Sequence, residues 1–140
     1  MISRYSLRAP SIADFEAMAR EVEDDMPPQF RDHLRDVVVR VDDFPTQEVV
    51  EAMGLESPYD ILGLYHGLDL AHKSVADSGA LPDMIYLYRR PILDYWRRSG
   101  EALRAIVTHV LVHEIGHHFG FSDADMEAIE AEIGGRDEGS

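Results

Sequence analysis

The feature that most constrains the fold is a stretch between residues 103 and 115 that is apolar on nearly every side. Its apolar members are Leu103, Ile106, Val107, Val110, Leu111, Val112 and Ile115. A helix without a polar face has to be buried among other elements. Ser99 can cap this helix and Gly120 can end it, so we expect a buried helix over about 100–119.

Two histidines near the end of this helix are the first candidates for chemistry. His113 and His117 are four residues apart, so they lie on one face of the helix, one turn apart. Two imidazoles at that spacing can reach one metal ion at about 2.0–2.1 Å each. Glu114 is rotated by about 100° from His113, where it can take a proton from a metal-bound water. Histidines that finished a buried helix without partners would be costly, which favours a metal site.

A catalytic zinc requires a third protein ligand and one open position. Gly120 can adopt a positive φ angle and reverse the chain, which makes Asp123 the best-placed carboxylate. The rival third ligands are acids of the following segment: Asp125, Glu127 and Glu130. Acids on a helix are most often solvated, so we rank them below Asp123. Chance gives His-Glu-x-x-His in this composition with a probability of about 0.03, and the longer string through Asp123 with about 0.0002.

The sequence around the other histidines gives weaker evidence for a function. His109 lies one turn before His113 on the same face, where it can hydrogen-bond a ligand or be an ordinary rim histidine. His118 is rotated by about 100° from His117, so we expect a surface or packing residue. No motif surrounds the remaining histidines, which are His33, His66 and His72.

Caps and apolar spacing indicate further helices. Ser11 caps a helix that runs to about Asp25. Its inward face is formed by Ile12, Phe15, Met18, Ala19 and Val22. Thr46 caps a short helix over 47–53, and a helix or turn covers 92–98. A last helix, over about 123–133, turns three residues inward: Met126, Ile129 and Ile133.

Three short segments are predicted to be strands. Residues 37–41 are rich in β-branched side chains and indicate a buried strand. Residues 61–66 and 84–88 are the other two, and Pro91 shortly after the last of them is typical of an edge strand. Helices and strands in this order predict one α+β domain over residues 1–140. The ends, about 1–8 and 134–140, are expected to be flexible.

The chain of 140 residues contains no cysteine. This excludes a disulfide framework, a thiolate zinc site and a cysteine nucleophile, so nitrogen and oxygen atoms must hold any metal. The absence of disulfides favours the cytoplasm. We recognise neither a secretory signal nor a membrane span, and therefore expect no membrane partner.

The formal net charge of −14 also limits the partners. Such a surface repels nucleic acid unless a local basic patch exists, and the two arginine doublets, 89–90 and 97–98, lie among acidic residues. The charge serves solubility, or it favours cationic peptide or protein partners. Acidity alone names no ligand, and the sequence leaves the oligomeric state open.

Three stretches together resemble a known family. They are residues 62–67, 81–93 and 113–123, the last reading His-Glu-x-x-His-x-x-Gly-x-x-Asp. That string is similar to the elongated metzincin signature, with Asp123 in the place of a third histidine. Over about residues 30–130 the chain resembles the small zincin-like metallopeptidases of bacteria, a minimal metzincin-like domain family formerly of unknown function.

The resemblance implies a zincin-like α+β fold, in which a sheet of three or four strands packs on the active-site helix. It implies one zinc ion per chain held by His113, His117 and Asp123, with Glu114 as the general base. In related zincins the substrate lies extended along an edge strand, which here would be the strand over residues 84–88.

We therefore expect a zinc-dependent peptidase that hydrolyses a peptide bond with a metal-activated water. An oxyanion donor is expected, and three tyrosines are candidates by residue type alone: Tyr65, Tyr86 and Tyr88. Tyrosines in strands are more often packing residues. The alternative is a zincin-fold module that binds a metal or a partner with little or no proteolysis. Glu114 favours the enzyme, because a binding module has no need of a general base.

Overall fold

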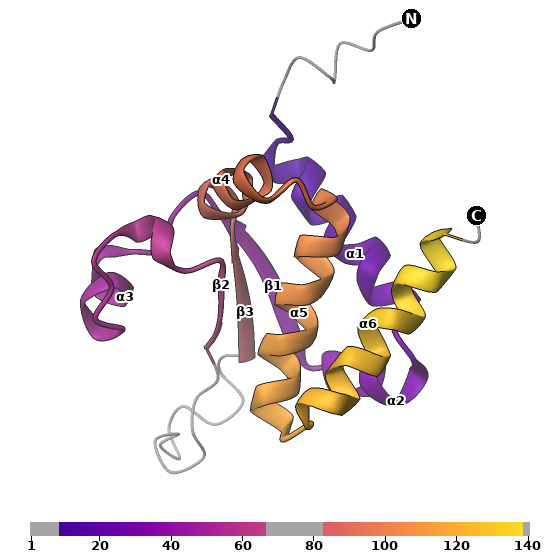
Figure 1. Ribbon diagram of the computed structural model, residues 1–140. Coiled ribbons are helices and arrows are strands. Elements are labelled where there is room, and N and C mark those ends of the chain that lie inside the picture. Colours follow the sequence, from indigo (N-terminus) through magenta and orange to yellow (C-terminus); the bar gives the residue numbers. More distant parts are fainter. Residues whose placement is uncertain (1–8, 67–82, 139–140) are drawn as a thin grey trace, which may run out of the picture.

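The computed structural model describes residues 9–66 and 83–138 (Figure 1). Its helices are α1 (Ile12–Asp25), α2 (Pro28–Arg31), α3 (Gln47–Ala52), α4 (Arg89–Ser99), α5 (Leu103–Phe119) and α6 (Asp123–Glu138). Its strands are β1 (Val37–Asp42), β2 (Gly63–His66) and β3 (Asp83–Tyr88). The predicted α+β architecture, with a small sheet beside a central helix, is confirmed.

The three strands form one sheet in the order β1-β3-β2. β1 runs parallel to β3, with Val39 opposite Ile85. β2 runs antiparallel to β3, with Tyr65 opposite the same residue. Within the described residues, β1 and β2 are therefore the edge strands, and each leaves one row of backbone groups unpaired by the sheet.

The prediction that residues 84–88 form an edge strand is wrong, because β3 is the central strand. Pro91 lies in the first turn of α4 and not in the sheet. Its missing N–H matters little there, since the first N–H groups of a helix have no intrahelical acceptor. The proline therefore carries no information about the order of the strands.

The core lies between one face of the sheet and the helices α1, α5 and α6 (Figure 1). Ile85 and Leu87 of β3 are fully buried against this layer. β1, expected to be buried, is buried on one face only: Val41 is 5% exposed, whereas Val38 is 45% exposed. The difference follows from the two-residue period of a strand, which turns alternate side chains away from the core.

α5 is the buried helix that the apolar stretch predicts, although it begins later than expected. Ser99 is the last residue of α4 and does not cap α5. Gly100, with φ +74°, separates the two helices, because a left-handed residue cannot continue an α-helix. α5 then begins at Leu103, and its residues Val107, Leu111, Val112 and Ile115 are fully buried. No helix of the described chain has the length and apolarity needed to cross a membrane.

The caps predicted for the other helices are confirmed, although Ile12, expected on the inward face of α1, is 37% exposed. The Ser11 side chain accepts a hydrogen bond from Asp14 N–H at 3.1 Å and completes a capping box. Thr46 likewise accepts from Val49 N–H at 3.2 Å at the start of α3. The inward residues of α6 are buried as expected: Met126, Ile129 and Ile133. α6 continues to residue 138, beyond the expected end at 133, and residues 1–8 and 139–140 lie outside the described chain.

β2 lies directly against α5 at Gly63. A Cβ atom at this position would lie 2.5 Å from Val110 Cγ1 and 2.9 Å from the backbone oxygen of Tyr86. We expect Gly63→Ala to lower the free energy of unfolding by about 1–3 kcal/mol, because the strand has to move away from α5. Urea denaturation measures the change. Gly134→Ala is the control, since it lies in α6 with nothing within 4 Å and should be neutral or slightly stabilising. Equal stability of Gly63→Ala and wild type would contradict this close packing.

Candidate metal centre

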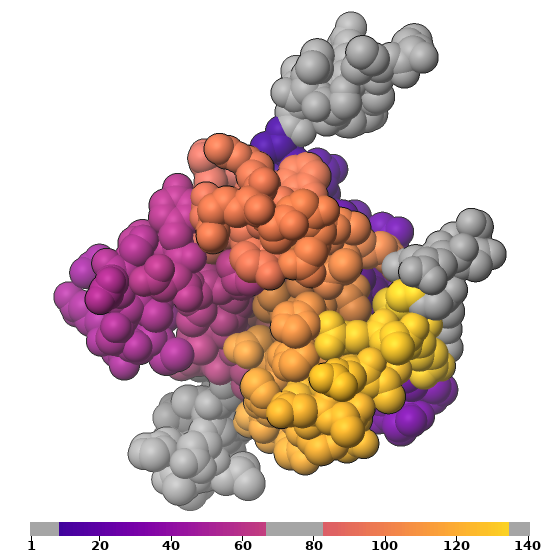
Figure 2. All heavy atoms as spheres, in the orientation of Figure 1, coloured from indigo at the N-terminus to yellow at the C-terminus, as the bar shows by residue number. Residues whose placement is uncertain are grey.

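The two histidines of the motif lie one turn apart near the end of α5, as their spacing predicts. The ring centroids of His113 and His117 are 5.7 Å apart. His113 is half-buried, with 23% of its side chain exposed, whereas His117 is exposed. Figure 2 shows this helix reaching the surface between the magenta segment before β3 and the yellow α6. The pair is therefore accessible to an ion from solvent.

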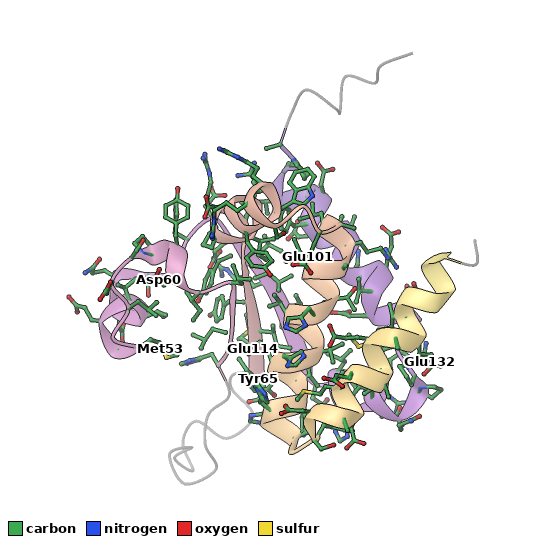
Figure 3. The ribbon with its side chains drawn as sticks, viewed as in Figure 1. Met53, Asp60, Tyr65, Glu101, Glu114 and Glu132 are labelled. Carbon is green, nitrogen blue, oxygen red and sulfur yellow. The ribbon has the colours of Figure 1, made fainter. Side chains whose placement is uncertain are left out.

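Glu114 points away from α6 and towards the edge strand β2 (Figure 3). Its Oε1 accepts a hydrogen bond from the Tyr65 backbone N–H at 3.2 Å. Burial raises the pKa of the Glu114 carboxyl, and the Tyr65 N–H, His117 and His113 each offset part of that rise. Glu114 is thus a half-buried carboxylate beside the histidine pair, with a higher affinity for a proton than an exposed glutamate.

The strand register explains why the Tyr65 N–H is available. Tyr88 N–H donates to the Leu62 oxygen at 3.0 Å, so the hydrogen-bonded pairs between β2 and β3 fall on every second residue from Leu62. Tyr65 lies between two such pairs, and its N–H points away from β3. Glu114 therefore occupies one position on the free edge of β2.

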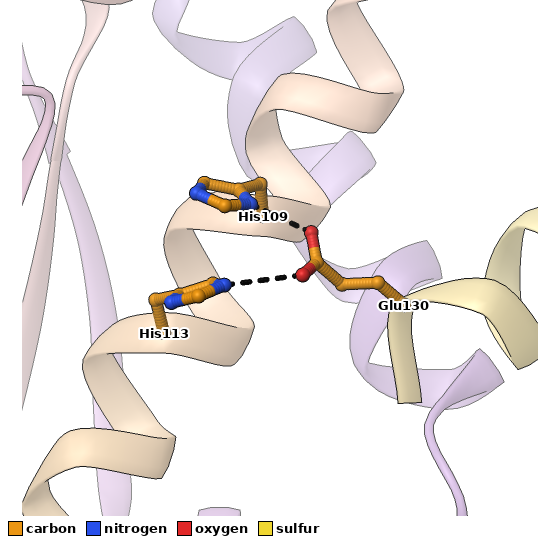
Figure 4. Close-up of side chains that lie close together, drawn as sticks. All are labelled: His109, His113 and Glu130. Atoms are coloured by element: carbon orange, nitrogen blue, oxygen red, sulfur yellow. Dashed lines mark hydrogen bonds and ion pairs between the residues drawn. The ribbon is translucent and has the colours of Figure 1, made fainter. Parts of the chain in front are cut away.

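A carboxylate of α6 joins two histidines of α5 (Figure 4). His109 Nδ1 lies 2.7 Å from Glu130 Oε1, and His113 Nε2 lies 3.1 Å from Glu130 Oε2. Their ligand atoms all lie within 4.8 Å of one another. Among the described residues, these three side chains form the group whose donor atoms lie close enough together to hold one metal ion. The structure gives His109 a carboxylate partner, and its role beside a metal ligand stays a prediction.

Asp123, the predicted third ligand, begins α6 and is exposed. It does not belong to the group around Glu130, so its role as a ligand stays a prediction. Among its rivals, Asp125 accepts from Ser122 N–H at 3.2 Å in a reciprocal capping pair at the start of α6, and Glu127 is exposed. Glu130 is the rival that the structure places beside His113. Its sequence signal is its spacing, four residues after buried Met126, which turns it towards α5.

Gly120 makes the reversal that the sequence predicts. It has φ +79°, and Phe121 N–H donates to the Gly116 oxygen at 2.8 Å, which closes the end of α5. α6 then returns along α5, and the Met126 side chain lies against Gly116. A side chain at Gly116 would displace Met126, so this glycine permits the close approach of α6 to the histidines.

Of the tyrosines considered as oxyanion donors by residue type, Tyr65 has its hydroxyl engaged elsewhere, and for Tyr86 and Tyr88 the role stays a prediction. The Tyr65 hydroxyl donates to Asp83 Oδ2 at 3.0 Å, and its ring stacks on His118 at a centroid distance of 3.9 Å. Burial, aided by Asp83, raises the pKa of Tyr65. Tyr86 and Tyr88 stack on each other, and burial raises the pKa of Tyr88 to about 12. His118 is a packing residue, as expected.

A groove of about 630 Å³ lies between α3 and the sheet. Its lining includes Arg40, Val49, Met53, Leu64, Tyr86 and Tyr88. The residues of the motif, His113, Glu114 and His117, do not line this groove. The groove therefore does not contain the motif histidines, but it reaches Tyr65, whose N–H binds Glu114.

The donor atoms near the end of α5 fit a zinc ion by their chemistry. Imidazole nitrogens and carboxylate oxygens are the ligands zinc takes when no thiolate is available. His113, His117 and His109 offer nitrogen atoms, and Glu130 and Asp123 offer oxygen atoms within the same helical hairpin. A three-ligand site with one open position can be built from them.

Comparison with known proteins agrees with this chemistry. A family model described as zincin-like metallopeptidase matches residues 34–133. The match runs from just before β1 into α6 and includes the His-Glu-x-x-His motif, Asp123 and Glu130. The search of curated proteins gives no match.

Proposed function

The chain belongs to the zincin-like metallopeptidase family, and from this premise we propose that it is a zinc-dependent peptidase that hydrolyses peptide bonds. The observation that carries the proposal is Glu114, a half-buried carboxylate between a histidine pair and the free edge of a strand. An acid in that place has one oxygen held by the strand and can serve a bound water with the other.

We assign the metal ligands as His113, His117 and Asp123, with one zinc ion per chain. The 5.7 Å distance between the two imidazole centroids and the chain reversal at Gly120 support this set. When bound, zinc would polarise the scissile carbonyl and lower the pKa of its water towards about 7. A cytoplasmic site of action is part of the proposal, in keeping with a chain that has no cysteine.

Glu114 acts as the general base in this proposal. It accepts the proton of the attacking water and delivers it to the leaving amine. The raised pKa of its carboxyl makes Glu114 a stronger proton acceptor than an exposed glutamate. The Tyr65 N–H positions the carboxylate by holding one of its oxygens and leaves the other available for the water.

The substrate is an extended peptide that pairs with β2, the edge strand beside Glu114. Gly63 presents its backbone N–H and oxygen at this edge, and Tyr65 presents its oxygen, because the alternate residues pair with β3. The Tyr65 N–H is held by Glu114. The net charge of −14 favours substrates that carry positive charge. The same charge argues against a nucleic-acid partner.

A binding module with little proteolysis is the second candidate function. One observation favours it: the 630 Å³ groove between α3 and the sheet does not include the histidine pair. A partner held in that groove would need no hydrolysis. Glu114 favours the peptidase over this candidate, because a binding module has no need of a general base.

Removal of the metal tests the peptidase directly. We expect the zinc-loaded protein to cleave members of a peptide library, and cleavage to cease after dialysis against a chelator. Readdition of zinc should restore it, because His113 and His117 remain in place. Cleavage sites identified by mass spectrometry also reveal any preference for basic residues. Cleavage that persists without metal would rule out the proposed chemistry, and no cleavage of any peptide by zinc-loaded protein would favour the binding module.

A further inference from the structure

We propose that His109, His113 and Glu130 form a second position for a divalent transition-metal ion, one helical turn before the His113–His117 pair. The two positions share His113. This proposal concerns metal binding alone and does not require the protein to hydrolyse peptides.

The geometry brings three donor atoms from two helices to one point (Figure 4). His109 Nδ1 and His113 Nε2 face the two oxygens of one carboxylate at 2.7 and 3.1 Å. All the ligand atoms lie within 4.8 Å of one another. A tetrahedral ion with bonds of about 2.0–2.1 Å requires ligand atoms about 3.3 Å apart, which rotation of these side chains can supply.

The donor set matches a zinc site with an open position. Two neutral imidazoles and one carboxylate are an established combination of zinc ligands, and a water completes the coordination. Access for that water is present, because 58% of the His109 side chain is exposed. The helices hold His113 and Glu130 more firmly, since each of these side chains is only 23% exposed.

His113 determines how the two positions are related. Its Nε2 atom has one lone pair, so it can bind one ion or donate a proton to Glu130, but cannot do both. An ion bound at this atom replaces the hydrogen bond and leaves the Glu130 carboxylate next to a cation. When both positions use Nε2 of His113, an ion at one position therefore excludes an ion at the other. The wild-type chain then holds one ion in total, at one position or the other.

The alternative is that Glu130 only receives hydrogen bonds from the two imidazoles. That arrangement predicts no zinc affinity once His117 is removed, because a single motif histidine with a distant carboxylate is a poor site. The second position predicts the opposite, since His117 is not among its ligands. The two readings can thus be separated by binding measurements.

The experiment is equilibrium dialysis of the full chain against zinc, with bound metal measured by elemental analysis. We expect His117→Ala to retain about one zinc per chain at the second position. Adding Glu130→Gln to this variant should weaken zinc binding by at least about tenfold, because a charged ligand is lost. Adding Glu127→Gln instead is the matched control and should change nothing, since Glu127 is exposed on the same helix.

Two results would overturn the proposal. One is a folded His117→Ala variant that binds no zinc, and the other is zinc affinity unchanged by the additional Glu130→Gln substitution. Circular dichroism establishes that each variant is folded, and His117→Gln replaces His117→Ala if the alanine variant is not. Either result leaves the proposed peptidase intact, because that function depends on His117 and is tested by cleavage. Conversely, absence of cleavage by the wild type leaves the second metal position untouched.

Discussion

Replacing Glu114 with glutamine is expected to lower kcat/KM for peptide hydrolysis by about 10²–10⁴-fold while the zinc content stays at the wild-type level. The amide has the same shape as the carboxylate but cannot accept the proton of the attacking water. Its oxygen can still accept the hydrogen bond from the Tyr65 N–H, so the side chain should stay in place. Initial rates with a cleaved library peptide and elemental analysis of the same sample measure both effects.

The control for this substitution is Glu127→Gln, which removes the same charge from an exposed position of α6. We expect it to keep full activity, which separates the role of Glu114 from the overall charge of the chain. A Glu114→Gln variant that holds zinc and cleaves as fast as the wild type would remove Glu114 from the mechanism. The metal site would then need a different base.

Replacing His113 with alanine is expected to have the largest effect on metal binding. His113 belongs both to the His113–His117 pair and to the group with His109 and Glu130. Its loss therefore disables both positions at once, and we expect zinc affinity to fall by more than about 100-fold. Equilibrium dialysis against a series of zinc concentrations gives the dissociation constants of variant and wild type.

His118→Ala is the matched control, because it removes an imidazole from the same helix without touching either ligand set. His118 stacks on Tyr65 at a centroid distance of 3.9 Å, so a small loss of stability is expected but no loss of zinc. Equal losses of zinc in His113→Ala and His118→Ala would show that helix stability, and not ligation, controls metal binding.

Features that depend on neighbours along the chain could be predicted from the sequence. Ser11 and Thr46 each cap their helix by accepting from a backbone N–H three residues away. The spacing of His113 and His117 places them one turn apart in any α-helix. Gly120 reverses the chain where the sequence indicates, because few other residues adopt its left-handed conformation without strain.

Features that depend on packing could not be predicted in the same way. Pro91 is compatible with an edge strand and with the first turn of a helix, and only the sheet order distinguishes the two. The spacing from Met126 turns Glu130 towards α5, but only the packing of α6 against α5 shows that it meets His109 and His113. The pairing of His109 with Glu130, 21 residues apart, is set by that packing.

The most direct test of this account is the zinc content of the wild-type chain after loading and exhaustive dialysis against metal-free buffer. We expect about one zinc ion per chain in the wild type and its loss in the His113→Ala variant. A folded protein that retains no zinc, at any loading concentration that leaves it soluble, would contradict a metal centre on α5 and with it the proposed peptidase.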